Sequence, residues 1–202
     1  QTTADAANFR RFIEETGLAQ PEGDTDVTFG GRRVTIDRFP IGIDVDSFAE
    51  MSRQASDEIR IDAMRRELLG RMQIIGVDRL DYSKGLPDRF RAFERLLAKY
   101  PELEKKVSFL QIAPPTREDV EAYSDIRIEL EGLAGAINGR YSDFNWTPLH
   151  YIHRSVPREK LAALFRSSRV GLVTPLRDGM NLVAKEFIAA QDPEDPGVLV
   201  LS

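Results

Sequence analysis

The stretch "VGLVTPLRDGMNLVAKEFIAAQDPEDPGVLVLS" (residues 170–202) contains two apolar runs separated by a polar turn and a mostly apolar helical segment. Near-continuous apolar strands that alternate with helices are typical of a parallel sheet covered on both faces. The turn contains Asp178 and Gly179, and the helical segment contains one acid, Glu186. The stretch therefore predicts a strand–helix–strand unit of an α/β fold, with an acid on either side of the strand-to-helix turn.

The same alternation extends back to about residue 71. Strand-like runs occupy 72–77, 107–113, 149–153, 170–176 and 197–202, and helical stretches lie at about 87–99, 117–138, 157–167 and 181–191. This order predicts a doubly wound, Rossmann-like parallel sheet, in which ligands bind beyond the carboxyl ends of the strands. We therefore expect a site in the loops after Val77, Ala113, His153 and Leu176.

The first 70 residues have a different pattern. It predicts a helix at 4–17 that ends at Gly17, a hairpin at 26–40 that turns at Gly30 and Gly31, an extended connector at 40–48 and a helix at 47–69. We predict that residues 1–45 are the end of a preceding domain and its connector, and that 46–202 form the Rossmann-like domain. Glutamine at position 1 and the final run "GVLVLS", which is typical of a buried strand, predict an internal segment of a longer enzyme, truncated at both ends.

The composition excludes several classes of protein. The 202 residues are 42% apolar and have a net charge of -5, which fits a globular chain without nucleic-acid or membrane partners. The chain has no cysteine, so disulfides and thiolate zinc sites are excluded and a reducing cytoplasm fits. The two histidines, His150 and His153, argue against a multi-histidine metal site, and we interpret both as structural.

Two bases follow the first strand of the predicted sheet, in "GVDRLDYSKGL" (residues 76–86). Arg79 and Lys84 lie between the strand end and a helix that opens near Pro87. They are either solvated surface bases or a pair that binds a diphosphate, to which Gly85 allows a close backbone approach. The chain contains neither G-x-x-x-x-G-K-[ST] nor G-x-G-x-x-G, so the site is neither an ATPase P-loop nor a dinucleotide fingerprint.

Two further loops contain polar residues that helix initiation does not explain. In "QIAPPTRED" (residues 111–119), Arg117 is a base at a helix start, where it is either an exposed side chain or a ligand contact. In "RDGMN" (residues 177–181), Asn181 suits a helix cap beside an anion-binding helix N-terminus. Asp178 is either a turn residue or a ligand contact, and Glu186 either faces solvent or the ligand. Carboxylates accept hydrogen bonds from sugar hydroxyls. The two acids therefore suit a ligand in which a diphosphate joins two sugars, with the acids in contact with the sugars.

The motifs together resemble one family. "GVDRLDYSKGLPDRF", "FLQIAPPTREDVEAY", "INGRYSDFNWTPLHYI" and the stretch 170–202 are similar to the trehalose-6-phosphate synthase family, over about residues 5–202. The resemblance implies a retaining glycosyltransferase of the GT-B type, with two Rossmann-like domains, of which this chain is part of the acceptor side and most of the donor side. It implies transfer of glucose from UDP-glucose to glucose 6-phosphate in the cytoplasm. It implies no cofactor and no metal, and it leaves a homo-oligomer open.

The resemblance also implies roles for individual residues. Arg79 and Lys84 match the pair of bases that binds the leaving diphosphate. Asp178 matches the acid that contacts the hydroxyls of the donor glucose, and Glu186 matches the acid that binds the ribose hydroxyls. The backbone around the sugar and phosphate corresponds to Gly179, Met180, Asn181 and Leu182.

Two further positions follow from the resemblance. Arg117 matches a base that reaches the phosphate of glucose 6-phosphate. Val156 lies where the family has a residue of the uracil pocket, often an aromatic one, so this chain departs from the family pattern at the base-binding position.

Two alternatives stay open. Glycogen-synthase-like and sucrose-phosphate-synthase-like enzymes share the spacing of seven residues between Asp178 and Glu186, although "RDGMNLVAKE" and the Arg117 loop favour the trehalose family. A non-catalytic regulatory subunit would be expected to lack some of Arg79, Lys84, Asp178 and Glu186, and all four are present. Because much of the family's site lies outside the chain, we expect the chain alone to be inactive.

Overall fold

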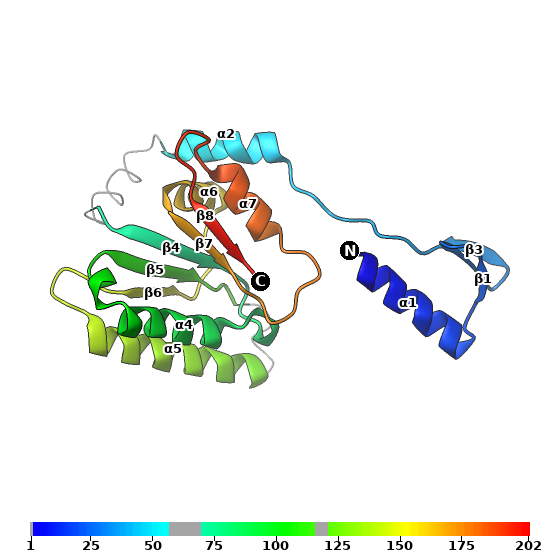
Figure 1. Ribbon diagram of the computed structural model, residues 1–202, viewed down its shortest axis with the longest axis horizontal. Coiled ribbons are helices and arrows are strands. Elements are labelled where there is room, and N and C mark those ends of the chain that lie inside the picture. Colours follow the sequence, from blue (N-terminus) through cyan, green and yellow to red (C-terminus); the bar gives the residue numbers. More distant parts are fainter. Residues whose placement is uncertain (1, 57–69, 116–120) are drawn as a thin grey trace. The chain divides into compact units, whose positions relative to one another are not determined.

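The computed structural model describes residues 2–56, 70–115 and 121–202 (Figure 1). The contacts divide the chain into two units. The first consists of Gln1–Gly42 with Gly179–Asn181, and the second of Ile43–Asp178 with Leu182–Ser202. Within the described ranges, no helix is both long enough and apolar enough to cross a membrane.

The first unit contains one helix and a small antiparallel sheet. The helix α1 (Thr3–Thr16) begins at a capping box formed by Thr2 and Asp5 and ends at Gly17, whose φ is 61°. The strands β1 (Gln20–Glu22), β2 (Asp26–Phe29) and β3 (Arg32–Thr35) pair in the order β1-β2-β3. Gly30 and Gly31 join β2 to β3 with φ values of 56° and 73°, as a tight two-residue hairpin turn requires. The predicted helix end and hairpin turn are confirmed, whereas β1 was not predicted.

The second unit is built on a five-stranded parallel sheet. Its strands are β4 (Met72–Val77), β5 (Val107–Ile112), β6 (Leu149–Ile152), β7 (Val170–Val173) and β8 (Val198–Leu201). The strand order is β6-β5-β4-β7-β8, and every neighbouring pair is parallel. The chain therefore runs outward from β4 through β5 to β6 and then crosses back to β7 on the other side of β4. The predicted doubly wound sheet is confirmed, and its order reverses between β4 and β7.

Helices cover both faces of this sheet (Figure 1). The helices α4 (Leu86–Lys99) and α5 (Glu121–Tyr141) lie on one face, where Phe90, Phe109 and Leu130 belong to one buried apolar cluster. The helices α2 (Val45–Ser56), α6 (Arg158–Ser167) and α7 (Leu182–Ala190) lie on the other face around Phe165 and Phe187. Two short 3-10 helices, η1 (Tyr82–Lys84) and η2 (Pro101–Leu103), precede and follow α4.

Most predicted helices are confirmed, with two differences at their ends. The helix predicted at 47–69 begins at Val45, and its part 57–69 lies outside the described residues. The helix predicted at 117–138 is described from Glu121 to Tyr141, and its first residues also lie outside the described ranges.

Two apolar runs are less buried than predicted. The run 170–176 is a strand only as far as Val173, and Leu176 in the following loop is 69% exposed. The run 197–202 forms β8, but Val198 and Leu201 are 62% and 57% exposed. The run is confirmed as a strand, which pairs only with β7 in the described sheet.

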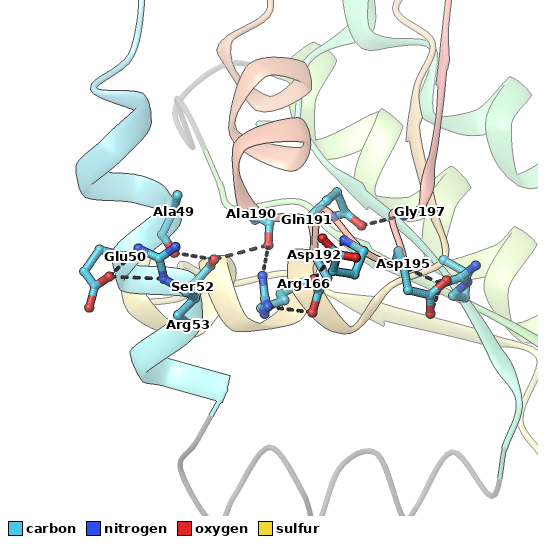
Figure 2. Close-up of polar contacts among 12 residues, drawn as sticks. Ala49, Glu50, Ser52, Arg53, Arg166, Ala190, Gln191, Asp192, Asp195 and Gly197 are labelled. Atoms are coloured by element: carbon cyan, nitrogen blue, oxygen red, sulfur yellow. Dashed lines mark hydrogen bonds and ion pairs between the residues drawn. The ribbon is translucent and has the colours of Figure 1, made fainter.

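Polar contacts hold the end of α7 against α2 and α6 (Figure 2). The carbonyl of Ala190 accepts hydrogen bonds from Ser52 Oγ at 3.2 Å and from Arg166 Nη1 at 3.3 Å. Arg166 Nη2 also pairs with Asp192 at 2.8 Å, and Gln191 Nε2 donates to a carbonyl of α6 at 2.8 Å. Because the last carbonyls of a helix lack partners within the helix, these side chains satisfy them. The helix that contains Glu186 is thus fixed at its carboxyl end.

Candidate functional site

The loop after β4 presents one base to solvent and turns another inward. Asp81 caps η1 by accepting a hydrogen bond from the Ser83 backbone at 2.8 Å, and η1 ends at Gly85, whose φ is 62°. Arg79, before this turn, is exposed. Lys84, the last residue of η1, has a side chain that is only 13% exposed. The two predicted bases therefore differ in exposure, and only the side chain of Lys84 is mostly buried.

The loop after β7 lies directly against the loop after β4. The backbone N–H groups of Leu176 and Arg177 both donate to the Ser83 carbonyl, at 2.8 and 3.1 Å. Gly85 has a φ of 62°, which favours glycine, and a Cβ atom there would lie 3.0 Å from Leu176 Cγ in this loop. The two loops are adjacent because the strand order reverses between β4 and β7, and ligands of doubly wound folds bind at such a reversal.

Lys84 and Asp178 form an ion pair at this point. Lys84 Nζ lies 2.6 Å from Asp178 Oδ2, and the two side chains are 13% and 20% exposed. The sequence predicts that both residues contact the same ligand from separate loops, and the structure brings them together. The arrangement provides a base and an acid with partly buried side chains at the carboxyl edge of the sheet, although the backbone at Asp178 is exposed.

Glu186 lies on α7, and its side chain is 21% exposed. Arg158 Nη2, at the start of α6, lies 3.5 Å from Glu186 Oε1, and the same guanidinium lies over the ring of Phe48 at 5.2 Å. Burial raises the pKa of Glu186, and the charge of Arg158 acts in the opposite direction. Arg158 was not among the predicted site residues, because nothing in the pattern of α6 relates its first residue to α7.

A buried polar network behind the two loops was also missed. Arg89 Nη1 lies 2.5 Å from Asp78 Oδ2, with both side chains 1% exposed, and 3.0 Å from Gln111 Oε1. Arg89 Nε donates to Thr174 Oγ1 at 3.1 Å, and Nη2 donates to the Lys84 carbonyl at 3.5 Å. Burial raises the pKa of Asp78, although the charge of Arg89 opposes this. The available signal was a base on the apolar face of α4, beside Leu86, Phe90 and Phe93, which are all buried.

The remaining predicted residues are more dispersed. Val156 is partly buried before α6, and Leu182 is the first residue of α7. Gly179, Met180 and Asn181 group with the first unit, and Arg117 lies outside the described residues.

The two histidines do not join the candidate residues. His150 is exposed, and His153 Nδ1 lies 2.8 Å from the Ala113 carbonyl, which agrees with the structural interpretation of His153.

A cavity of about 880 Å³ lies along β6 rather than at the loops described above. Its lining includes Trp146, His150 and Val156, and Val156 is the only predicted site residue among them. The charged side chains of the candidate site, Lys84 and Asp178, lie where the two loops meet and do not line this cavity. Across the part of the chain that the structure describes, no three acidic or histidine side chains group as metal ligands would.

Comparison with known proteins identifies the family. The sequence profile of glycosyltransferase family 20 matches residues 1–202. The chain belongs to glycosyltransferase family 20. Among curated relatives, the trehalose-6-phosphate synthase of Klebsiella pneumoniae subsp. pneumoniae is 48% identical over 204 residues, and that of Enterobacter sp. is 53% identical over 205 residues. Each match covers 100% of this chain but only 42% of the relative, so the chain spans less than half the length of these family 20 proteins.

Solved structures agree with this assignment. A UDP-forming trehalose-phosphate synthase from Burkholderia xenovorans has a TM-score of 0.94 and 52% identity, and the chain covers 45% of it. A structure of that enzyme in complex with glucose-6-phosphate has a TM-score of 0.93. The E. coli protein bound with UDP-2-fluoro glucose has a TM-score of 0.92 and 46% identity, and the chain covers 44% of it. The resemblance to the trehalose-6-phosphate synthase family is confirmed, and so is the Rossmann-like fold that the alternation of strands and helices predicts.

Proposed function

We propose that this chain is most of the donor side of a retaining glucosyltransferase, which transfers glucose from UDP-glucose to glucose 6-phosphate and releases trehalose 6-phosphate and UDP. The observation that supports this function best is the meeting of Lys84 and Asp178, 2.6 Å apart, where the strand order reverses. The relatives' names, and the glucose-6-phosphate and UDP-2-fluoro glucose bound in two of the solved structures, support the choice of substrates. In this proposal, residues 46–202 bind the donor and residues 1–45 belong to the acceptor-side domain and its connector.

The leaving diphosphate is the group that needs stabilisation. Breaking the bond between glucose and UDP places negative charge on the diphosphate while positive charge develops on the sugar. Fixed cationic donors stabilise such charge most when they are preorganised and shielded from water. Lys84 is 13% exposed and held in one direction by η1, whereas Arg79 is exposed and can approach the diphosphate from solvent. We assign both bases to the diphosphate.

The acids bind the two sugars. Asp178 accepts hydrogen bonds from hydroxyls of the donor glucose, and Glu186 accepts them from the ribose hydroxyls. The backbone of residues 179–182 and the N-terminus of α7 surround the sugar and the phosphate. Because Lys84 and Asp178 are paired in the structure, the diphosphate has to replace Asp178 as the partner of Lys84, and the glucose hydroxyls then become the partners of Asp178.

The remaining roles rest on the family resemblance. Arg117 binds the phosphate of glucose 6-phosphate, and Val156 lines the uracil pocket. The reaction needs neither a metal nor a cofactor in this proposal, and we assign it to the cytoplasm. A homo-oligomer of the full-length enzyme is compatible with these roles.

Calorimetric titration of UDP and UDP-glucose tests the site. In the full-length protein that contains this segment, Lys84→Ala removes a charge-assisted hydrogen bond to the diphosphate. We expect UDP affinity to fall roughly ten- to a hundredfold. Glu186→Ala should also weaken UDP, through the lost ribose contact. Lys99→Ala is the matched control, because Lys99 is an exposed lysine at the end of α4. If Lys84→Ala and Glu186→Ala bind UDP as the wild type does, the site assignment is wrong.

Product assays test the reaction. We expect the full-length protein to use glucose 6-phosphate in preference to a glucan or fructose 6-phosphate, and the 202-residue chain alone to form no trehalose 6-phosphate. The reason is that the relatives contain more than twice the length of this chain. Trehalose 6-phosphate formed by the isolated chain would contradict the second expectation, and a preference for glucan or fructose 6-phosphate would contradict the first.

A further inference from the structure

Arg89 contacts the two loops that present Arg79, Lys84 and Asp178 at the carboxyl edge of the sheet. Its guanidinium bonds Asp78 at the end of β4, Gln111 in β5, Thr174 after β7 and the backbone carbonyl of Lys84, at distances of 2.5, 3.0, 3.1 and 3.5 Å. Asp78 immediately precedes Arg79, and Thr174 lies four residues before Asp178. Each charged group assigned to the diphosphate or the glucose is thus within four residues of an Arg89 contact.

We propose that Arg89 is a positioning residue of the donor site, whose guanidinium holds the Lys84 loop and the Asp178 loop at the separation that the diphosphate requires. The inference rests on the proposed function only for the identity of the ligand. Arg89 itself is 2% exposed and lies behind the loops, so it acts through Lys84 and Asp178 rather than by touching the donor.

Packing alone does not require a charge at this position. Replacing a buried ion pair by apolar residues of similar volume is often neutral or stabilising, because both charges lose their hydration. Burial raises the pKa of Asp78, and the charge of Arg89 acts in the opposite direction. An apolar side chain could not donate hydrogen bonds to Asp78, Gln111 and Thr174, which lie on three different segments. A planar guanidinium has donors arranged for this, and a lysine ammonium does not.

Gly76 in β4 leaves room for the guanidinium of Arg89 beside the strand. A Cβ atom at Gly76 in β4 would lie 2.9 Å from Arg89 Nη1, which is closer than real Cβ contacts. Glycine at this position lets the guanidinium lie against the β4 backbone and reach Gln111 on the neighbouring strand. The network is therefore built into the centre of the sheet as well as into its loops.

Two substitutions test the inference in the full-length protein, with calorimetric titration of UDP as the first measurement. Arg89→Lys keeps a positive charge beside Asp78 but loses the separate donors to Thr174 and to the Lys84 carbonyl. Thr174→Val removes only the acceptor on the Asp178 loop and preserves the shape of the side chain. We expect each to lower UDP affinity about tenfold, because small displacements of binding groups have large effects. Arg91→Lys is the control, since Arg91 lies on the same helix with its side chain 46% exposed.

A second measurement does not depend on any ligand. The rate at which an amine-reactive acylating reagent modifies Lys84, followed by mass spectrometry, reports how well this amine is held beside Asp178. We expect faster modification of Lys84 in Arg89→Lys and Thr174→Val, with unchanged modification of exposed Lys99 and similar melting temperatures. Unchanged modification of Lys84 in both variants would overturn the inference. If Arg89→Lys does not fold, the modification rate of Lys84 in Thr174→Val still tests the inference.

A double substitution separates positioning from general stabilisation. If Arg89 acts through Lys84, Arg89→Lys should have little further effect on UDP affinity once Lys84 is alanine, because interacting residues are not additive. An equal loss in both backgrounds would overturn the inference. A wild type that does not bind UDP, with Lys84 modification still faster in Arg89→Lys, would contradict the proposed function and support the positioning role.

Discussion

Removing the charge of Asp178 should strengthen the binding of UDP, although Asp178 is itself a residue of the proposed site. In the structure, Lys84 Nζ lies 2.6 Å from Asp178 Oδ2, so a diphosphate has to compete with this carboxylate for the lysine. When UDP-glucose binds, the glucose hydroxyls can replace Lys84 as hydrogen-bond partners of Asp178. UDP has no glucose, so it cannot replace this contact. Asp178→Asn should therefore increase the affinity for UDP more than the affinity for UDP-glucose.

The magnitude follows from the burial of the pair. Exposed ion pairs contribute about 0.2–1 kcal/mol, but these side chains are only 13% and 20% exposed, so water screens them less. A hydrogen bond to a charged group contributes about 1.5–3 kcal/mol, of which the asparagine amide retains a part. We expect UDP binding to gain about 1–2 kcal/mol, which is a roughly five- to thirtyfold increase in affinity.

Calorimetric titration of UDP and of UDP-glucose into the full-length protein measures both effects. Asp88→Asn is the control for the change in net charge, since Asp88 lies on α4 with its side chain 65% exposed. UDP-glucose should gain less than UDP in Asp178→Asn, because its hydroxyls lose a charged acceptor. If UDP binds Asp178→Asn no more tightly than Asp88→Asn, the competition between Asp178 and the diphosphate is refuted.

Three further outcomes follow from the glycines and from Glu186. Gly171→Ala should destabilise the fold by about 1–3 kcal/mol in urea denaturation, because its Cβ would lie 2.7 Å from the ring of Phe187; an unchanged midpoint would contradict the packing. Gly135→Ala in α5, where a Cβ would meet nothing within 4 Å, should instead stabilise the fold by about 0.5–1 kcal/mol in the same assay, and a loss of stability would refute this. Burial raises the pKa of Glu186, so this carboxyl is protonated at a higher pH than an ordinary glutamate, and UDP affinity should fall as the pH is lowered through that raised pKa. Arg158→Gln removes the opposing charge and should move the loss to higher pH in titrations across the acidic range; an unmoved profile would show that Glu186 is not the titrating group.

The order of apolar runs along the chain was enough to predict the parallel sheet. Each predicted run contains a strand, because a strand buried on both faces requires continuous apolar sequence. The order of strands within the sheet could not be predicted this way, since the same apolar runs satisfy many orders. It is this order, with β7 beside β4, that brings Lys84 to Asp178 across 94 positions of the chain.

The buried residues that support the site, Arg89 and its partners, could not be predicted from sequence patterns. Arg89 was a single base on an apolar helix face, and its partners Asp78, Gln111 and Thr174 lie on three different segments.

The double hydrogen bond to Ser83 has a consequence for motion. One carbonyl accepts the N–H groups of both Leu176 and Arg177, so the loop after β7 cannot lift away without breaking two bonds to the loop after β4 at once. Local opening of a protein proceeds in cooperative units, and this shared acceptor joins the two loops into one such unit. A ligand that touches only the loop after β4 should therefore slow amide hydrogen exchange at Leu176 and Arg177 as well. The site would open and close as a single element.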